Sequence, residues 1–317
     1  MAASVVLALG APAHAADFPE RPVRIVVPFA PGAGADIASR FMAAKLGELW
    51  GVGTVVENKV GANGIIGANF VAHAPADGYT LLAPNDTTLA ANPALYVELP
   101  YDPVKDFAPI ALIGETPFVL VASPTLHVHS VKELVEAARA KPGGISFGTG
   151  GIASSQHLPI EMLMAGARIR MLHVPFKGSQ DAVNAMVGDH VQVMFAGVSA
   201  VLPFLQNGTL VPLAVGTTER LSVLPNVPTM VESGYPGFRY GAWLGFAAPA
   251  NTPQAVVAKI NADIDSILRR PDVRDQLLGM GFLPAKPGTP EEYRRFIGDE
   301  VARYGKLIRA AGIEPQR

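Results

Sequence analysis

Two glycine-rich segments are the parts of this sequence best suited to bind a small ligand. Residues 28–36 read PFAPGAGAD and residues 148–155 read GTGGIASS, and each lies between an expected strand and an expected helix. Glycine lets a ligand approach the main chain, and the free N–H groups at a helix start favour an anion. One such turn in each of two domains would clamp a small anion. Asp36 is expected to be the N-cap of its helix, a structural role.

Polar side chains follow other expected strands. Lys177 lies at a third strand-to-helix junction, where its charge could offset that of a carboxylate, although a lone lysine is more often solvated. Asn85, Asp86 and Thr87 follow a strand at the edge where α/β sheets bind ligands. His157 is the histidine expected near the cleft, where it would contact ligand or make a structural hydrogen bond.

The glycine turns also resemble dinucleotide-binding fingerprints. Gly148-x-Gly150-x-x-Ala153 fits the loose pattern, but no acidic residue ends the strand that follows it. An NAD-dependent oxidoreductase is therefore only a distant alternative. The chain has no cysteine, and it has no H-E-x-x-H, G-x-S-x-G or G-x-x-x-x-G-K-[ST] motif. The sequence thus predicts a protein that is not an enzyme, with no catalytic residue, metal site or cofactor.

The bulk properties favour a folded binding protein. A formal charge of −2, with no Lys/Arg run, gives no footprint for nucleic acid or an anionic membrane. An apolar run ends in Ala13-x-Ala15, which fits a signal peptide over residues 1–15, although no basic residue precedes the run. Later segments lack the ~18–20 apolar residues of a membrane helix, so we expect a periplasmic protein that does not insert in the membrane.

Alternating strand and helix patterns indicate an α/β protein, and 317 residues favour two domains. β-rich runs at 109–123 and 238–247 are expected to cross between the domains. Domain 1 is then expected at 16–121 plus 243–317, and domain 2 at 122–242. The other expected strands are 24–27, 54–57, 79–83, 145–147, 171–174, 191–195 and 213–215. The expected helices are 36–49, 64–73, 130–140, 154–165, 179–187, 253–269 and 290–311, and residues 224–237 are expected to form a Pro-rich loop.

These segments resemble the Bug (TctC-like) substrate-binding proteins of tripartite tricarboxylate transporters. The resemblance spans most of the chain, and it rests on VPFAPGAGAD (27–36), VENKVGANGIIGA (56–68), DGYTLL (77–82), GTGGIASSQH (148–157), HVPFKGS (173–179), VMFAG (193–197), LPNVPTMVESGYPGF (224–238) and APANTP (248–253). It implies a type II-like periplasmic-binding-protein fold, in which two α/β domains are joined by two crossing strands with the ligand cleft between them. It also implies a monomeric receptor that captures a small organic carboxylate for membrane permease subunits. A sensing or scavenging protein of the same fold is the alternative.

The sequence departs from the family where it matters for ligand charge. Many members carry Asp and Asn after VMF, whereas this chain has Ala196 and Gly197, so we expect a carboxylate ligand without an amino group. Phe29 and Phe176 are expected to form apolar walls. The full set of expected ligand-binding residues is Phe29, Ala30, Pro31, Gly32, Ala33, Gly34, Asn85, Asp86, Thr87, Thr149, Gly150, Ala153, Ser154, His157, Phe176, Lys177, Ser179, Ala196 and Gly197.

Overall fold

A mixed β-sheet runs through the molecule in the computed structural model, which describes residues 18–152, 154–310 and 312–316. Its strands follow the order β2-β1-β3-β9-β4-β7-β5-β6, and β8 and β10 also pair with β4. The strands are β1 (Val23–Val27), β2 (Thr54–Asn58), β3 (Thr80–Leu82), β4 (Phe107–Ala122), β5 (Ser146–Thr149), β6 (Leu172–Pro175), β7 (Val193–Gly197), β8 (Val211–Val215), β9 (Gly241–Pro249) and β10 (Leu283–Pro284).

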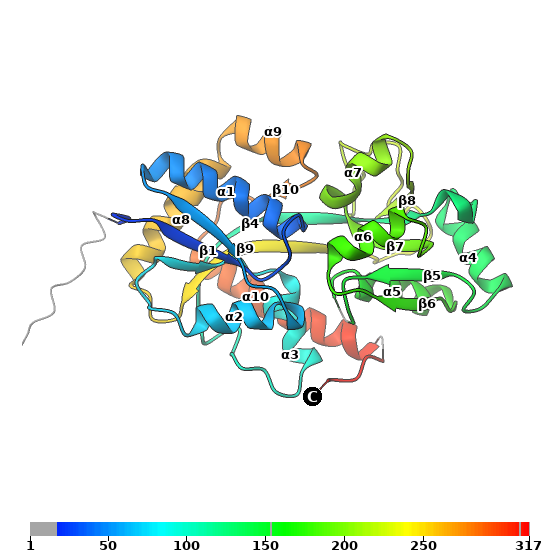
Figure 1. Cartoon of the computed structure of the whole chain (residues 1–317), viewed down its shortest axis with the longest axis horizontal. Helices are drawn as coiled ribbons and strands as arrows, with labels where there is room; N and C mark the ends of the chain where they lie inside the picture. The colour runs from blue at the N-terminus through cyan, green and yellow to red at the C-terminus, as the bar shows by residue number, and fades with distance from the viewer. Residues whose placement is uncertain (1–17, 153, 311, 317) are drawn as a thin grey trace, which may run out of the picture.

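Helices cover the sheet in two groups, one at each end of the molecule (Figure 1). The first group is α1 (Gly34–Trp50), α2 (Ile65–Ala72), α3 (Asn92–Leu95), α8 (Gln254–Leu268), α9 (Pro271–Gly279) and α10 (Pro290–Ala310). The second group is α4 (Val131–Ala140), α5 (His157–Ala167), α6 (Ser179–Val187) and α7 (Val198–Gln206). Shorter turns are η2 (Ala62–Gly64), η3 (Thr87–Ala91) and η4 (Pro124–Leu126).

The strands β4 and β9 extend from one group toward the other (Figure 1). β4 pairs with β9 along residues 107–117, and then with β7 and β8 along residues 118–122. These are the two expected crossing segments, although β9 begins at Gly241, three residues later than expected. The helix α10 is tied to β9, because the indole N–H of Trp243 donates to Glu300 Oε2 at 3.0 Å. The domain boundaries themselves stay a prediction.

Three apolar clusters fix the ends of the strands. One packs α1 and α8 against β1 and β3, with Ile25, Met42 and Ile260 fully buried. A second lies between α6, α7 and the strands β4 and β7, and a third, larger cluster extends along the opposite face. Because strands of this sheet are buried on both faces, the turns that follow them have little freedom to shift.

The start of α1 corrects one expectation. Asp36 is not the N-cap: Ala33 holds that position, and no side chain caps it. Asp36 lies in the first turn, where its carboxylate accepts from the Gly32 N–H at 3.0 Å and from Asn58 Nδ2 at 2.8 Å. Burial opposes the charge, but these hydrogen bonds and one from Arg40 outweigh it and lower the pKa of Asp36. Asp36 therefore has a structural role that joins the first glycine turn to β2.

Candidate ligand-binding site

A cavity of about 350 Å³ lies where the turns that follow β1, β3, β5, β6 and β7 meet. This volume lies within the range of small-molecule sites. Residues from both glycine turns and from the 177–181 junction contribute to its wall. The expected residues found there are Phe29, Ala30, Ala33, Gly34, Asn85, Thr87, Gly150, Ser154, Lys177, Ser179 and Gly197.

Helix starts surround the cavity. α1, α6 and α7 begin at its wall, and residues 154–156, just before α5, line it too. The N–H groups of a helix's first turn have no partner within the helix, and the helix dipole makes that end positive. At α1 the N–H groups of Asp36 and Ile37 bond to the Ala33 carbonyl, which leaves the wall residues Gly34 and Ala35 to offer theirs to a ligand. The cavity is therefore suited to an anion.

Side chains add to this preference. Ser154 lies at the wall, and its hydroxyl oxygen is buried without a hydrogen-bond partner in the described part of the chain. Lys177 supplies a positive charge at an exposed position. Among the lining residues Asp181 is the one carboxylate, and it too is exposed.

Other expected residues lie away from the cavity wall. Pro31 and Gly32 are exposed and do not line the cavity, whereas Thr149 and His157 are buried and do not line it either. Phe176 packs on the apolar cluster beneath α6 and α7. Ala153 lies outside the described residues, as does the expected signal peptide at 1–15.

Ala196 requires a correction. It is fully buried in the apolar cluster beneath α6 and α7, opposite Val119 of β4. Successive residues of a strand face opposite sides, so Gly197 faces the cavity and Ala196 does not. An acidic side chain at position 196 would therefore enter the core and not the ligand site.

The second glycine turn offers fewer free donors than expected. The Gly150 N–H donates to Gln156 Oε1 at 2.6 Å, and the Gly151 N–H donates to Thr149 Oγ1 at 3.3 Å. This turn is thus held by its own side chains.

Sequence reasoning missed several wall residues. Thr116 and Phe118 of β4 line the cavity, and so do Ala242 and Trp243 of β9. A signal was present, because both strands were expected to cross between the domains, and Thr116 and Phe118, two residues apart on β4, face the same side. The segment 60–64, Gln180, Asp181 and Ala200 were also missed.

Known proteins share this sequence and architecture. A family model described as the tripartite tricarboxylate transporter family receptor matches residues 38–313. The chain belongs to this family. Protein BugT of Bordetella pertussis (strain Tohama I) is 35% identical over 309 residues, covering 96% of this chain and 94% of BugT. The structure of R. palustris Rpa4515 with adipate has a TM-score of 0.91 at 33% identity, covering 94% of this chain and all of that one. MatC (Rpa3494) from Rhodopseudomonas palustris with bound malate has a TM-score of 0.85 at 33% identity, covering 92% of this chain and 100% of that one.

Membership of this receptor family confirms the resemblance and the periplasmic-binding-protein fold, in which the cavity lies beside the crossing strands. Within the described residues, no helix has both the length and the apolar character needed to cross a membrane. The same part of the chain contains no group of three or more His, Asp or Glu side chains placed to hold a metal ion.

A histidine stack supports the second glycine turn of this receptor. The ring centroid of His173 lies 4.1 Å from the ring centroid of His157 and 4.8 Å from that of Phe147. Its Nε2 is 2.6 Å from Thr149 Oγ1, and Thr149 Oγ1 is also 3.0 Å from the Gly151 carbonyl oxygen. Burial, and next the neighbouring His157, lower the pKa of His173 to about 4.

The stack makes stability depend on pH. The pKa of His173 is lower in the folded chain than its ordinary 6.5, so the unfolded chain binds more protons between pH 6.5 and 4 and stability falls as pH falls through that window. Between pH 6.5 and 4 the wild type should lose about 1–2 kcal/mol of its free energy of unfolding through His173, after allowance for the exposed part of the ring, and we expect His173→Gln to abolish this loss. Urea unfolding from pH 7 to 4.5 measures the difference.

Two comparisons make this measurement specific. The pKa of Asp86 is raised to about 6, mainly by burial, so its contribution has the opposite sign, but it cancels when variant and wild type are compared. His73→Gln, at an exposed histidine outside the stack, should keep the wild-type pH profile. Parallel profiles for wild type and His173→Gln would show that the stack does not control acid stability.

Proposed function

We propose that this chain is a periplasmic receptor that captures a small organic carboxylate and delivers it to the permease subunits of a tripartite transporter. The observation that carries the proposal is the meeting of three helix starts and Lys177 at one cavity. Relatives of the same family have been solved with adipate and with malate, which are both carboxylates. The proposed role is capture and release, with no catalytic step.

We further propose that the two groups of elements act as the domains 16–121 plus 243–317 and 122–242. Each glycine turn then belongs to a different domain, so a ligand that contacts both favours the compact arrangement. The chain between the domains is carried by β4 and β9; β4 pairs with β9 along one part of its length and with β7 and β8 along the rest.

A thermal-shift screen tests the proposal. The panel comprises adipate, malate, citrate and benzoate, with the neutral diamide of adipate as control. A carboxylate present at 1,000 times its Kd should add roughly 4 kcal/mol to the apparent stability. The diamide should give no shift, because it lacks the charge that the helix starts attract. Equal shifts with adipate and its diamide, or none across the carboxylates, would contradict the proposal.

A further inference from the structure

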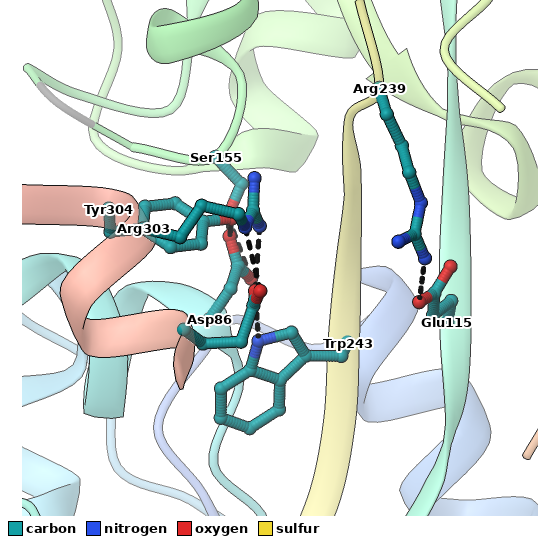
Figure 2. Close-up of polar contacts among 8 residues, drawn as sticks. Asp86, Glu115, Ser155, Arg239, Trp243, Arg303 and Tyr304 are labelled. Carbon is teal, nitrogen blue, oxygen red and sulfur yellow. Dashed lines mark hydrogen bonds and ion pairs between the residues drawn. The ribbon is translucent and has the colours of Figure 1, made fainter. Parts of the chain in front are cut away.

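A buried carboxylate lies just behind the cavity. Asp86 has no exposed surface, and it accepts a hydrogen bond from the Tyr304 hydroxyl at 2.7 Å and one from the Ser155 hydroxyl at 3.0 Å. Ser155 Oγ also lies 2.8 Å from Thr87 Oγ1. Figure 2 shows Asp86 between Ser155 and the side chain of Tyr304. Asp86 does not line the cavity, so the expectation that it forms the ligand wall does not hold.

This cluster joins segments that are far apart in the chain. Asp86 and Thr87 follow β3, and Tyr304 belongs to α10, so both lie in the first group of elements. Ser155 lies between β5 and α5 in the second group. A second bond spans the same gap, because Asn63 Nδ2 donates to the Ile152 carbonyl at 3.1 Å. Ile152 and Ser155 are therefore each held by a residue of the other group.

The contact borders the ligand cavity directly. Thr87 and Ser155 each contribute to the wall, and Ser154, whose buried hydroxyl has no partner in the described chain, precedes Ser155. Ser155 is thus a wall residue whose side chain is held by Thr87 and Asp86. An isolated buried carboxylate is costly, and its hydrogen bonds reduce that cost.

We infer that Asp86 and Ser155 form a closure latch, in which the carboxylate of one domain holds the hydroxyl of the other and keeps the cavity closed over a bound ligand. Asp86 is then a positioning residue that acts through Ser155 without touching ligand. The inference rests on the proposed function, since a latch has a role only if the two domains open and close.

The latch should control release more than capture. Opening breaks the Asp86–Ser155 and Thr87–Ser155 contacts, so their loss should raise the rate of ligand dissociation. Association begins from the open form, in which these contacts are absent, so its rate should change little. We expect Ser155→Ala and Asp86→Ala each to raise the dissociation rate about tenfold, which equals about 1.4 kcal/mol.

Two measurements test the latch. The chain lacks cysteine, so spin labels at Lys105→Cys and Lys132→Cys, both highly exposed, report the distance between the groups without further changes. Without ligand, Ser155→Ala and Asp86→Ala should displace the distance distribution from that of wild type. Adipate release is followed by tryptophan fluorescence in a Trp50→Phe background, which leaves Trp243 of the cavity wall as the one tryptophan of the chain.

Matched variants separate the latch from general damage. Asp86→Asn keeps an oxygen that accepts from both hydroxyls, so it should restore most of the wild-type distribution. The two alanine changes should be non-additive when combined, because they remove the same contact. Ser266→Ala removes an exposed hydroxyl that bonds only within α8 and should change nothing.

The two ideas can fail separately. Wild-type distance distributions in both alanine variants would overturn the latch, even if adipate binds well. Failure of wild type to bind any carboxylate would overturn the proposed function, while the ligand-free distances would still decide whether Asp86 and Ser155 hold the domains together.

Discussion

A carboxylic acid should bind this receptor at least about 100-fold more tightly than the same acid carrying an α-amino group. An ammonium that is buried on binding needs a carboxylate partner, because an unpaired buried charge costs several kcal/mol, and 100-fold corresponds to about 2.7 kcal/mol. The lining residues supply only Asp181, at an exposed position. The oxygens of Asp86 are already engaged by Tyr304 and Ser155.

Calorimetry with adipate and 2-aminoadipate measures this ratio directly. The pair differs only in the amino group, so differences in chain length and carboxylate number cancel. Asp181→Asn is the informative control, and we expect it to leave the preference for adipate intact. Tighter binding of the amino acid, lost on Asp181→Asn, would contradict the prediction and identify Asp181 as the ammonium partner.

The fold could be predicted because its signals are local and repeated. Short β-branched runs followed by amphipathic segments predict strands and helices, and the glycine turns between them predict where the ligand edge lies. The start of α4 illustrates such a signal: Ser130 is its N-cap, and its hydroxyl accepts from the Glu133 N–H at 3.2 Å. Gly34, Gly150 and Ser179 follow from the same reasoning and line the cavity.

The expected ligand-binding residues that do not line the cavity were misplaced because tertiary packing sets their positions. Sequence shows that Ala196 and Gly197 follow a strand, but only the register against β4 shows that Gly197 faces the cavity. Asp86 has a polar side chain at the ligand edge, yet Tyr304, which is 218 residues away, takes one of its oxygens. Propensity cannot supply contacts of that range.

Helix α7 shows a different limit. Its sequence VSAVLPFLQ is apolar and contains Pro203, so the pattern resembles a buried strand as much as a helix. The structure makes it a helix that starts at the cavity, with Gly197 as its N-cap. One of the helix starts that make the cavity suited to an anion was therefore absent from the sequence-based picture.

A substitution at Gly150 should cause a second large change in ligand affinity. At this residue the two glycine-containing turns of the second group are in contact. A Cβ added at Gly150 would lie 2.7 Å from the Ser179 nitrogen and 3.0 Å from the Gly178 carbonyl carbon. Both neighbours are main chain at the start of α6, so they cannot move aside as a flexible side chain could. Gly150, Gly178 and Ser179 all line the cavity.

We expect Gly150→Ala to lower carboxylate affinity at least about 100-fold, because the turn must move away from α6 and the donors on either side then no longer converge on one anion. Overpacking should also cost about 1–3 kcal/mol of stability. Adipate calorimetry, done well below the melting temperature of the variant, separates the two effects. Gly298→Ala is the control: its added Cβ in α10 meets nothing within 4 Å, so affinity should be unchanged and stability equal or higher. Wild-type affinity in folded Gly150→Ala would mean that the ligand does not depend on this junction, and the anion would then have to be held by the starts of α1 and α7 alone.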